Sequence, residues 1–215
     1  MQTMRVKATI AAMMLTLVGA GAATGQDMLI FGGGKIELNF PSEGATQDLS
    51  IYIEAERGGV YGGVLGLVSN DQTAAKVELY AGYRAETATG FTYDLSYTRF
   101  NYPNDSGDCC GEVALYFAQQ VHDTINLSTK VTYDPDVSLA GIEIGAEISA
   151  TDTLTVSANY MMSQQAVGAN DKSWDIGVGY DLHDDTSLDL RYYHGSDTPG
   201  YFGIALSFET NLLGG

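Results

Sequence analysis

Two glutamates with apolar neighbours stand in the stretch AGIEIGAEIS, residues 140–149. Glu143 and Glu147 occupy odd positions, and the even positions hold only alanine and isoleucine. Side chains alternate between the two faces of a β-strand, so both carboxylates share one face and the isoleucines share the other. Carboxylates on one face lower the local electrostatic potential and favour positive ions nearby. The sequence therefore predicts a cation-attracting surface on one side of this strand.

The same alternation places many other charged residues on the face shared by Glu143 and Glu147. The predicted acids are Glu37, Glu54, Glu56, Glu78, Glu86, Asp94, Glu112, Glu143, Glu147, Asp175, Asp189 and Glu209, and the predicted bases are Lys35, Lys76, Arg84, Lys130 and Arg191. We expect Lys130 to lie one strand from Glu143, and Arg84 one strand from Asp94. Acids outnumber bases on this face, so it should be negatively charged.

The sequence pattern does not supply the residues of a hydrolytic site. Such a site needs a serine with a histidine in reach and a third group that orients the histidine. His122 and His183 fall at tight turns, His194 lies near a loop at the opposite end, and there is no G-x-S-x-G motif. The stretch GGGK (32–35) lacks the spacing of a phosphate-binding loop. We expect no enzymatic activity, no cofactor and no metal site.

The two cysteines, Cys109 and Cys110, are adjacent. In an oxidising compartment they could close a strained disulfide ring, which would make the surrounding loop redox-sensitive, or they could join another chain. The alternative is a pair of thiols, free or bridged, without a function. Asp105 and Asp108 lie nearby but add no known metal-ligand spacing.

The elements that carry these residues are short strands repeated along the chain, with no sustained helical periodicity. High Gly (26) and Tyr (14) with little Pro (4) agree with a β-rich protein. The predicted strands are 34–40, 49–56, 59–69, 76–86, 91–102, 112–120, 124–134, 139–149, 153–163, 173–182, 186–194 and 201–210.

Short connections alternate strictly with longer or more acidic ones. The short connections are 56–59, 87–90, 121–124, 150–153 and 183–186, and the others are 41–47, 70–75, 103–111, 134–136, 163–172 and 195–200. An even number of antiparallel strands with short turns at one end and longer loops at the other is typical of an outer-membrane β-barrel. A soluble β-sandwich is the competing architecture, because it also alternates polar and apolar residues.

The composition of the two faces favours the barrel. The apolar faces are smooth, as in Leu49, Ile51, Ile53, Val77, Leu79, Ala81, Phe202, Ile204, Leu206 and Phe208. Tyr83, Tyr133, Trp174, Tyr180 and Tyr192 stand near strand ends, as expected of aromatic girdles at lipid headgroups. The opposite faces are rich in Gly and Ser, which suit a crowded concave wall. For residues 59–69 both faces are Gly and aliphatic, so their orientation stays open.

The first residues of the chain have the layout of a secretory signal peptide. Arg5 and Lys7 precede a short apolar run, 8–20, and small residues follow in GAATGQD (21–27). We predict residues 1–25 as the cleaved signal and 26–215 as one barrel domain. The formal net charge of the chain is −17, and such acidity argues against binding nucleic acid.

Several strand motifs resemble the TorF-type putative porins, a bacterial outer-membrane β-barrel family. The motifs are GGVYGGVLGLVSN (58–70), VELYAGY (77–83), FTYDLSYTRFNYPND (91–105) and GEVALYF (111–117), and the resemblance is best over 49–133. It implies a porin-like role and brings no catalytic residues.

Two features depart from that family. The first strand holds GKIELNFPSEG where the family has a strand resembling S-D-Y-x-x-R-G, so the family's arginine is missing. Barrels of this class also tend to finish on an aromatic residue that the assembly machinery recognises, whereas this chain reads SFETNLLGG. We predict that Phe208 serves as that aromatic and that residues 211–215 form a loose tail.

The sequence thus predicts an all-β transmembrane antiparallel barrel of about twelve strands, with short periplasmic turns and longer extracellular loops, in the bacterial outer membrane. We expect passive diffusion of small solutes, with a lean toward cations. Outer-membrane lipid and the barrel-assembly machinery are the expected partners. The alternative is a closed structural or interaction barrel that presents its acidic loops (Glu43, Asp71, Asp105, Asp108, Asp136, Asp171, Asp197) and could bind divalent cations there. About twelve strands is intermediate between a filled and an open barrel, so width does not decide.

Overall fold

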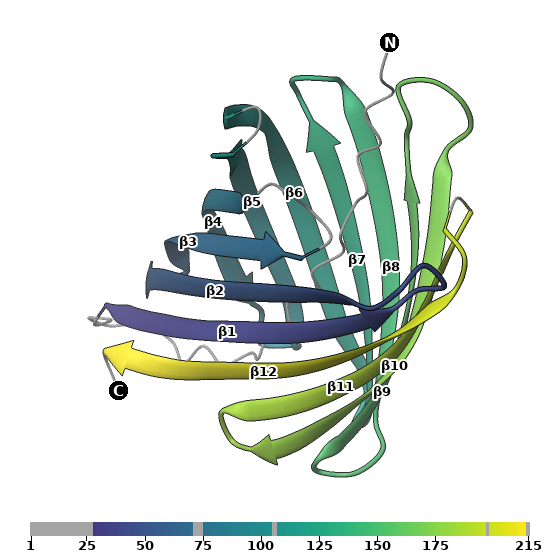
Figure 1. The fold of residues 1–215 in the computed structure, drawn as a ribbon. Helices are drawn as coiled ribbons and strands as arrows, with labels where there is room; N and C mark the ends of the chain where they lie inside the picture. The colour runs from purple at the N-terminus through teal and green to yellow at the C-terminus, as the bar shows by residue number, and fades with distance from the viewer. Residues whose placement is uncertain (1–27, 71–74, 105–106, 197, 214–215) are drawn as a thin grey trace.

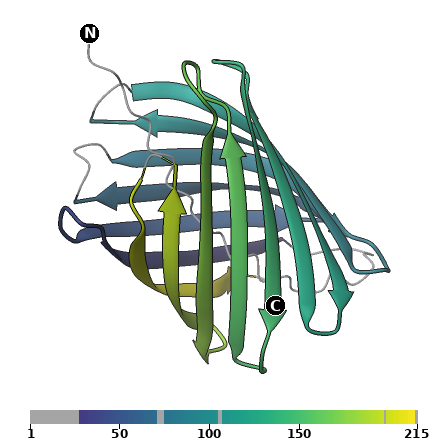
Figure 2. The same ribbon diagram turned by 90° about the vertical axis from the view of Figure 1, so that its right-hand side faces the viewer.

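The computed structural model describes residues 28–70, 75–104, 107–196 and 198–213. Within them, twelve strands form one closed antiparallel barrel, in which each strand pairs with the next and β1 pairs with β12 (Figures 1 and 2). The strands are β1 Leu29–Phe40, β2 Thr46–Arg57, β3 Val60–Ser69, β4 Lys76–Glu86, β5 Phe91–Tyr102, β6 Gly107–His122, β7 Ile125–Asp134, β8 Leu139–Ser149, β9 Leu154–Ser163, β10 Asp171–His183, β11 Thr186–Gly195 and β12 Tyr201–Leu213. The predicted fold class is confirmed.

No helix in the described ranges is long and apolar enough to cross a membrane.

Most strand bounds agree with the sequence pattern, and the differences fall where side chains carry little information. Strand β1 begins at Leu29 rather than at residue 34, because Gly32–Gly34 pair through their backbones with both β2 and β12. Strand β6 begins at Gly107 rather than at residue 112. Glycine-rich and cysteine-containing stretches show no alternation, yet their backbone groups still join the ladder.

The turn between β2 and β3 illustrates the short-turn end of the barrel. Gly58 and Gly59 both have positive φ, 63° and 82°, and Arg57 pairs directly with Val60. A two-residue hairpin turn of this kind requires φ > 0 at both central positions, which glycine adopts without steric cost. The hairpin fixes the register of β2 and β3 and thereby the face on which each of their residues lies.

The prediction of a loose tail is wrong for residues 211–213. Strand β12 continues to Leu213, with Asn211 opposite Phe31 and Leu213 opposite Ile30 across a register shift. An unpaired strand edge is costly in lipid, because its backbone groups have no partner there. The long strand β1 therefore holds β12 beyond Phe208. Residues 214–215 lie outside the described part of the chain.

The outer surface of the barrel is apolar and carries aromatic clusters at two levels. Ile51, Leu79 and Phe202 are among its most exposed side chains. Near the longer loops, the ring of Trp174 packs against that of Tyr192 with centroids 5.6 Å apart. Other aromatic pairs, Tyr83–Tyr93 and Phe91–Phe117, lie near the short turns. This exposed apolar surface fits lipid rather than water, which favours the membrane barrel over the sandwich.

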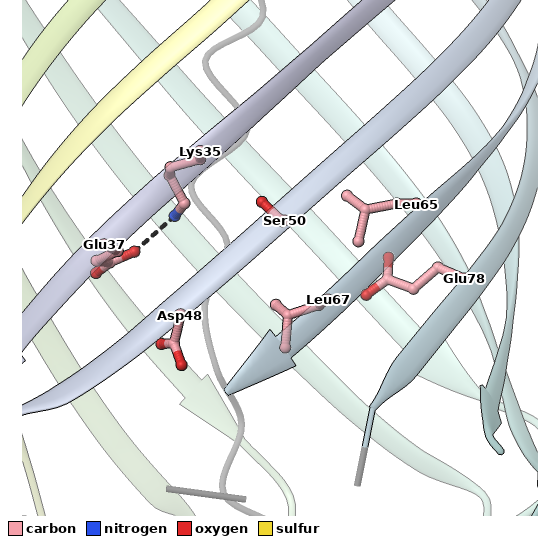
Figure 3. A pocket seen from close by; sticks show the side chains of 7 residues that line it. All are labelled: Lys35, Glu37, Asp48, Ser50, Leu65, Leu67 and Glu78. Carbon is pink, nitrogen blue, oxygen red and sulfur yellow. Dashed lines mark hydrogen bonds and ion pairs between the residues drawn. The ribbon is translucent and has the colours of Figure 1, made fainter. Parts of the chain in front are cut away.

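The structure also decides the orientation of β3, which the sequence left open. Tyr61 and Leu65 are buried on the inner face, whereas Val60 and Val68 are exposed on the outer face. Leu65 and Leu67 therefore lie on the inner wall beside charged residues of β1, β2 and β4 (Figure 3).

Candidate functional site

The inner wall of the barrel has two parts that differ in how many of their charges form ion pairs. We call the inner face of β9–β12 and β1–β5 the paired wall, and the inner face of β6–β8 the open wall. Strand order makes each of them continuous, because β1 and β12 are neighbours. Together they carry the charged residues that the sequence pattern assigned to one face.

Arg191 is the centre of one network on the paired wall. Its guanidinium forms an ion pair with Asp175 and another with Asp189 at 3.0 Å, and it donates to Ser157 Oγ at 2.8 Å. Asn159 also donates to Asp175 at 2.9 Å. Arg191 and Asp175 are only 5% and 4% exposed. Two charges this buried are tolerable only when they are paired and hydrogen-bonded.

Arg84 is the centre of a second network, with partners that sequence spacing did not identify. Arg84 stands opposite Asp94 in the β4–β5 register, as predicted. Its ion pairs, however, are with Glu54 and, at 3.0 Å, with Glu56, both on β2 beyond the intervening β3. The guanidinium also lies 4.0 Å from the ring centre of Tyr61, a cation–π contact. Asp94 instead accepts a hydrogen bond from the Tyr61 hydroxyl at 2.7 Å.

These long side chains lie flat on the wall because glycines lie beneath them. A Cβ added at Gly63 would stand 2.5 Å from the ring of Tyr80, and one at Gly82 would stand 2.6 Å from the ring of Tyr61. A Cβ at Gly177 would similarly stand 2.6 Å from the guanidinium of Arg191. Glycine thus allows a long side chain to pass over the neighbouring strand: Tyr61 crosses β4 to Asp94 on β5, and Arg191 crosses β10 to Ser157 on β9.

Sequence reasoning missed the tyrosines of this wall. Tyr52 donates to Glu209 across β1, and Tyr193 donates to Glu37 at 3.1 Å across β12. The available signal was their position on the same alternation as the inward glycines. The sequence pattern instead indicates tyrosines at the lipid interface, because a tyrosine ring is also suited to the headgroup region.

A small hollow lies in the paired wall near the longer loops (Figure 3). It is lined by Lys35, Glu37, Asp48, Ser50, Leu65, Leu67 and Glu78. Lys35 Nζ lies 2.7 Å from Glu37 Oε2, and Lys76 Nζ lies 2.6 Å from Glu78 Oε1. Two of its three carboxylates, Glu37 and Glu78, therefore have counter-ions, and Asp48 accepts a hydrogen bond from Asn39 at 3.3 Å.

The open wall differs because its carboxylates are less well matched by bases. Its one base among the described residues is Lys130, whose Nζ lies 3.8 Å from Glu112 Oε1. Lys130 stands opposite Glu143 in the β7–β8 register, as expected. Within the described residues, no basic nitrogen lies within 4.0 Å of a carboxylate oxygen of Glu143 or Glu147. The neighbouring isoleucines, Ile142, Ile144 and Ile148, are exposed on the outer face.

The rim near the longer loops carries a separate ion-pair cluster. Arg99 is bidentate to Asp108, at 2.6 and 2.8 Å, and its third nitrogen lies 2.7 Å from Asp136. The guanidinium lowers the pKa of the Asp108 carboxyl below its usual range by direct hydrogen bonding. Cys109 and Cys110 are joined by a disulfide beside it, at a register shift between β5 and β6. Asp105 lies outside the described residues.

The histidines are dispersed over the barrel. His122 and His183 end β6 and β10 at the short turns, and the ring of His194 packs on Trp174 at 5.6 Å. In the part of the chain that the structure describes, no three His, Cys, Asp or Glu side chains gather as a metal site.

Comparison with known structures places the fold among outer-membrane porins. The KdgM porin matches with a TM-score of 0.65 at 9% identity, over 85% of this chain and 98% of that one. A structure of the KdgM porin in complex with disordered oligogalacturonate matches with a TM-score of 0.61. The NanC porin matches with a TM-score of 0.59 at 10% identity, over 86% of this chain and 100% of that one. At such identities the likeness shows the fold alone.

No curated protein matches the chain in sequence. A family model described as Gram-negative porin matches residues 7–199, which is most of the chain. This match and the closed twelve-stranded barrel agree on a location in the outer membrane. The chain belongs to the Gram-negative porin family.

Proposed function

We propose that the barrel is a channel for passive diffusion of small solutes, with a preference for cations. The observation that carries the proposal is the position of Glu143 and Glu147 on the open wall. Both lie on the face opposite the exposed isoleucines, and no described base is within ion-pair distance of either. Carboxylates that lack protein counter-ions recruit cations from the solution.

The small residues of the open wall support an open path beside these carboxylates. Gly141 and Gly145 share the inner face of β8 with Glu143 and Glu147, and Ser128 faces Gly145 from β7. Short side chains leave room that long ones fill on the paired wall. A twelve-stranded barrel is wider than an eight-stranded one, whose interior side chains just fill.

The charges of the inner wall also lead us to expect poor passage of anionic solutes. One KdgM porin structure contains oligogalacturonate, a sugar chain with carboxylates. The bases of the present paired wall are engaged with acids, as Arg84 and Arg191 show. We therefore expect this barrel to pass small cations and neutral solutes better than acidic oligosaccharides.

Finer assignments follow as part of the proposal. The motifs in 58–70, 77–83, 91–105 and 111–117 support a TorF-type member of the porins. Residues 1–25 would direct export and be cleaved. Lipid and the barrel-assembly machinery would then be the partners of the mature barrel, which would have no enzymatic activity.

The test is ion selectivity of the refolded protein in a planar bilayer with a KCl gradient. We expect discrete conductance steps and a cation-leaning reversal potential. The double variant Glu143→Lys/Glu147→Lys should lower the cation-to-anion permeability ratio roughly tenfold, since four unit charges change near the path. Glu43→Lys/Asp136→Asn, which alters charge only at the extracellular loops, is the control and should change it little.

Two outcomes would contradict the proposal. Unchanged selectivity in a conducting double variant would exclude Glu143 and Glu147 as determinants. A folded, heat-modifiable wild-type protein that never conducts would favour the closed barrel with acidic loops instead.

A further inference from the structure

Lys130 differs from the other inward bases of the described barrel in how loosely it is held. Its Nζ lies 3.8 Å from Glu112, and its side chain is 42% exposed. Lys35 and Lys76 lie 2.7 and 2.6 Å from their acids, and their side chains are 24% and 17% exposed. A long ion pair between solvated groups is weak. The ammonium of Lys130 is therefore free to leave Glu112.

A second carboxylate stands within reach of the same ammonium. Lys130 is directly opposite Glu143 across β7 and β8, where facing Cβ atoms are about 4.5–5.5 Å apart. On its other side, Lys130 faces the uncharged Tyr116 of β6, and beyond Tyr116 lies Asp94, which accepts a hydrogen bond from Tyr61. Four methylene groups allow the ammonium to turn from Glu112 to Glu143, so the two acids can share one counter-ion.

We infer that Lys130 is a tethered counter-ion of the open wall, shared between Glu112 and Glu143, and that it limits the cation preference of the channel. Permeating cations compete with its ammonium for the same carboxylates. Small inorganic cations and primary ammonium ions are the solutes that match these sites, because the lysine head group is itself a primary ammonium. The inference rests on the proposed channel function.

The test compares Lys130→Gln with wild type in a planar bilayer under a KCl gradient. Loss of one positive charge from the open wall should raise the cation-to-anion permeability ratio roughly twofold to threefold. The gain should shrink in about 1 M salt, where the Debye length falls to about 3 Å. Lys130→Arg should keep the wild-type ratio. Lys172→Gln removes the same charge from an exposed position on β10 and should also keep it.

A second variant tests whether the carboxylate of Glu112 acts on the same path. Glu112→Gln leaves Glu143 as the partner of Lys130, so the ratio should fall by a similar factor. Wild-type ratios in both Lys130→Gln and Glu112→Gln, in a cation-selective wild-type channel, would overturn the inference and leave the proposed function standing. A wild-type protein that prefers anions or never conducts would overturn both.

Discussion

The paired wall and the open wall both carry inward carboxylates, but these carboxylates differ in their ion pairing and in their exposure. On the paired wall, Asp175 is enclosed by Arg191 and is almost inaccessible. On the open wall, Glu147 is exposed and has no described base nearby. Both walls contain inward glycines and inward acids. Their long polar side chains differ: Arg84 and Arg191 lie on the paired wall, and Lys130 is the one described base of the open wall.

What differs is the side chain that lies over each glycine. On the paired wall the space above Gly63 is taken by Tyr80, and the space above Gly177 by Arg191. On the open wall a Cβ at Gly145 would meet Ser128 Oγ at 2.5 Å, and one at Gly141 would meet Thr132 Oγ1 at 2.7 Å. Short hydroxyl side chains cannot reach an acid two strands away. A glycine on the inner wall is therefore part of an ion-pair or hydrogen-bond network only when a long polar side chain lies across it.

The largest expected effect comes from removing the buried charge of the paired wall. Arg191→Gln leaves Asp175 and Asp189 without their counter-ion in a poorly solvated position, so we expect a loss of about 3–5 kcal/mol in the free energy of unfolding. Denaturant titration of the refolded barrel in micelles measures it. Lys130→Gln on the open wall is the matched control and should cost less than about 1 kcal/mol. Equal losses would remove the distinction between the walls.

A smaller effect should follow from filling a glycine position of the paired wall. Gly63→Ala places a methyl group 2.5 Å from Tyr80 and 2.7 Å from the Ile53 carbonyl oxygen. Displacing that ring should cost about 1–3 kcal/mol. Gly66→Ala on the same strand is the control, because a Cβ there has nothing within 4 Å. If both variants unfold at the same denaturant concentration, the packing of Tyr80 over Gly63 does not stabilise the paired wall.

The smallest effect concerns the solvent-exposed rim. Arg99 lowers the pKa of Asp108, so their contact is present at neutral pH and is lost as pH falls through that lowered pKa. Arg99→Gln should return the Asp108 pKa to its ordinary range, as followed by carboxyl NMR during an acid titration. Asp136→Asn, which leaves the bidentate contact in place, should change it less. An Asp108 pKa that stays low in Arg99→Gln would point to another cause.

Much of the fold could be predicted because alternation is a local property. Each strand shows which of its residues share a face, as in Ile142 and Ile144 against Glu143, without reference to any other strand. The alternation of short and long connections then indicates an antiparallel barrel. The prediction failed at residues 211–213, where the composition resembles a tail and only pairing with β1 makes a strand.

The sequence by itself therefore determined the barrel, its apolar exterior and the acidic character of its interior. Only the tertiary structure decided which charges are neutralised. Arg84 stands opposite Asp94, as its spacing predicts, but its guanidinium crosses β3 and pairs with Glu54. That choice depends on Tyr61 and Tyr80, on the glycines beneath them, and on the register of strands β2–β5. A partner two strands away is fixed by how several hairpins pack together, which no local pattern records.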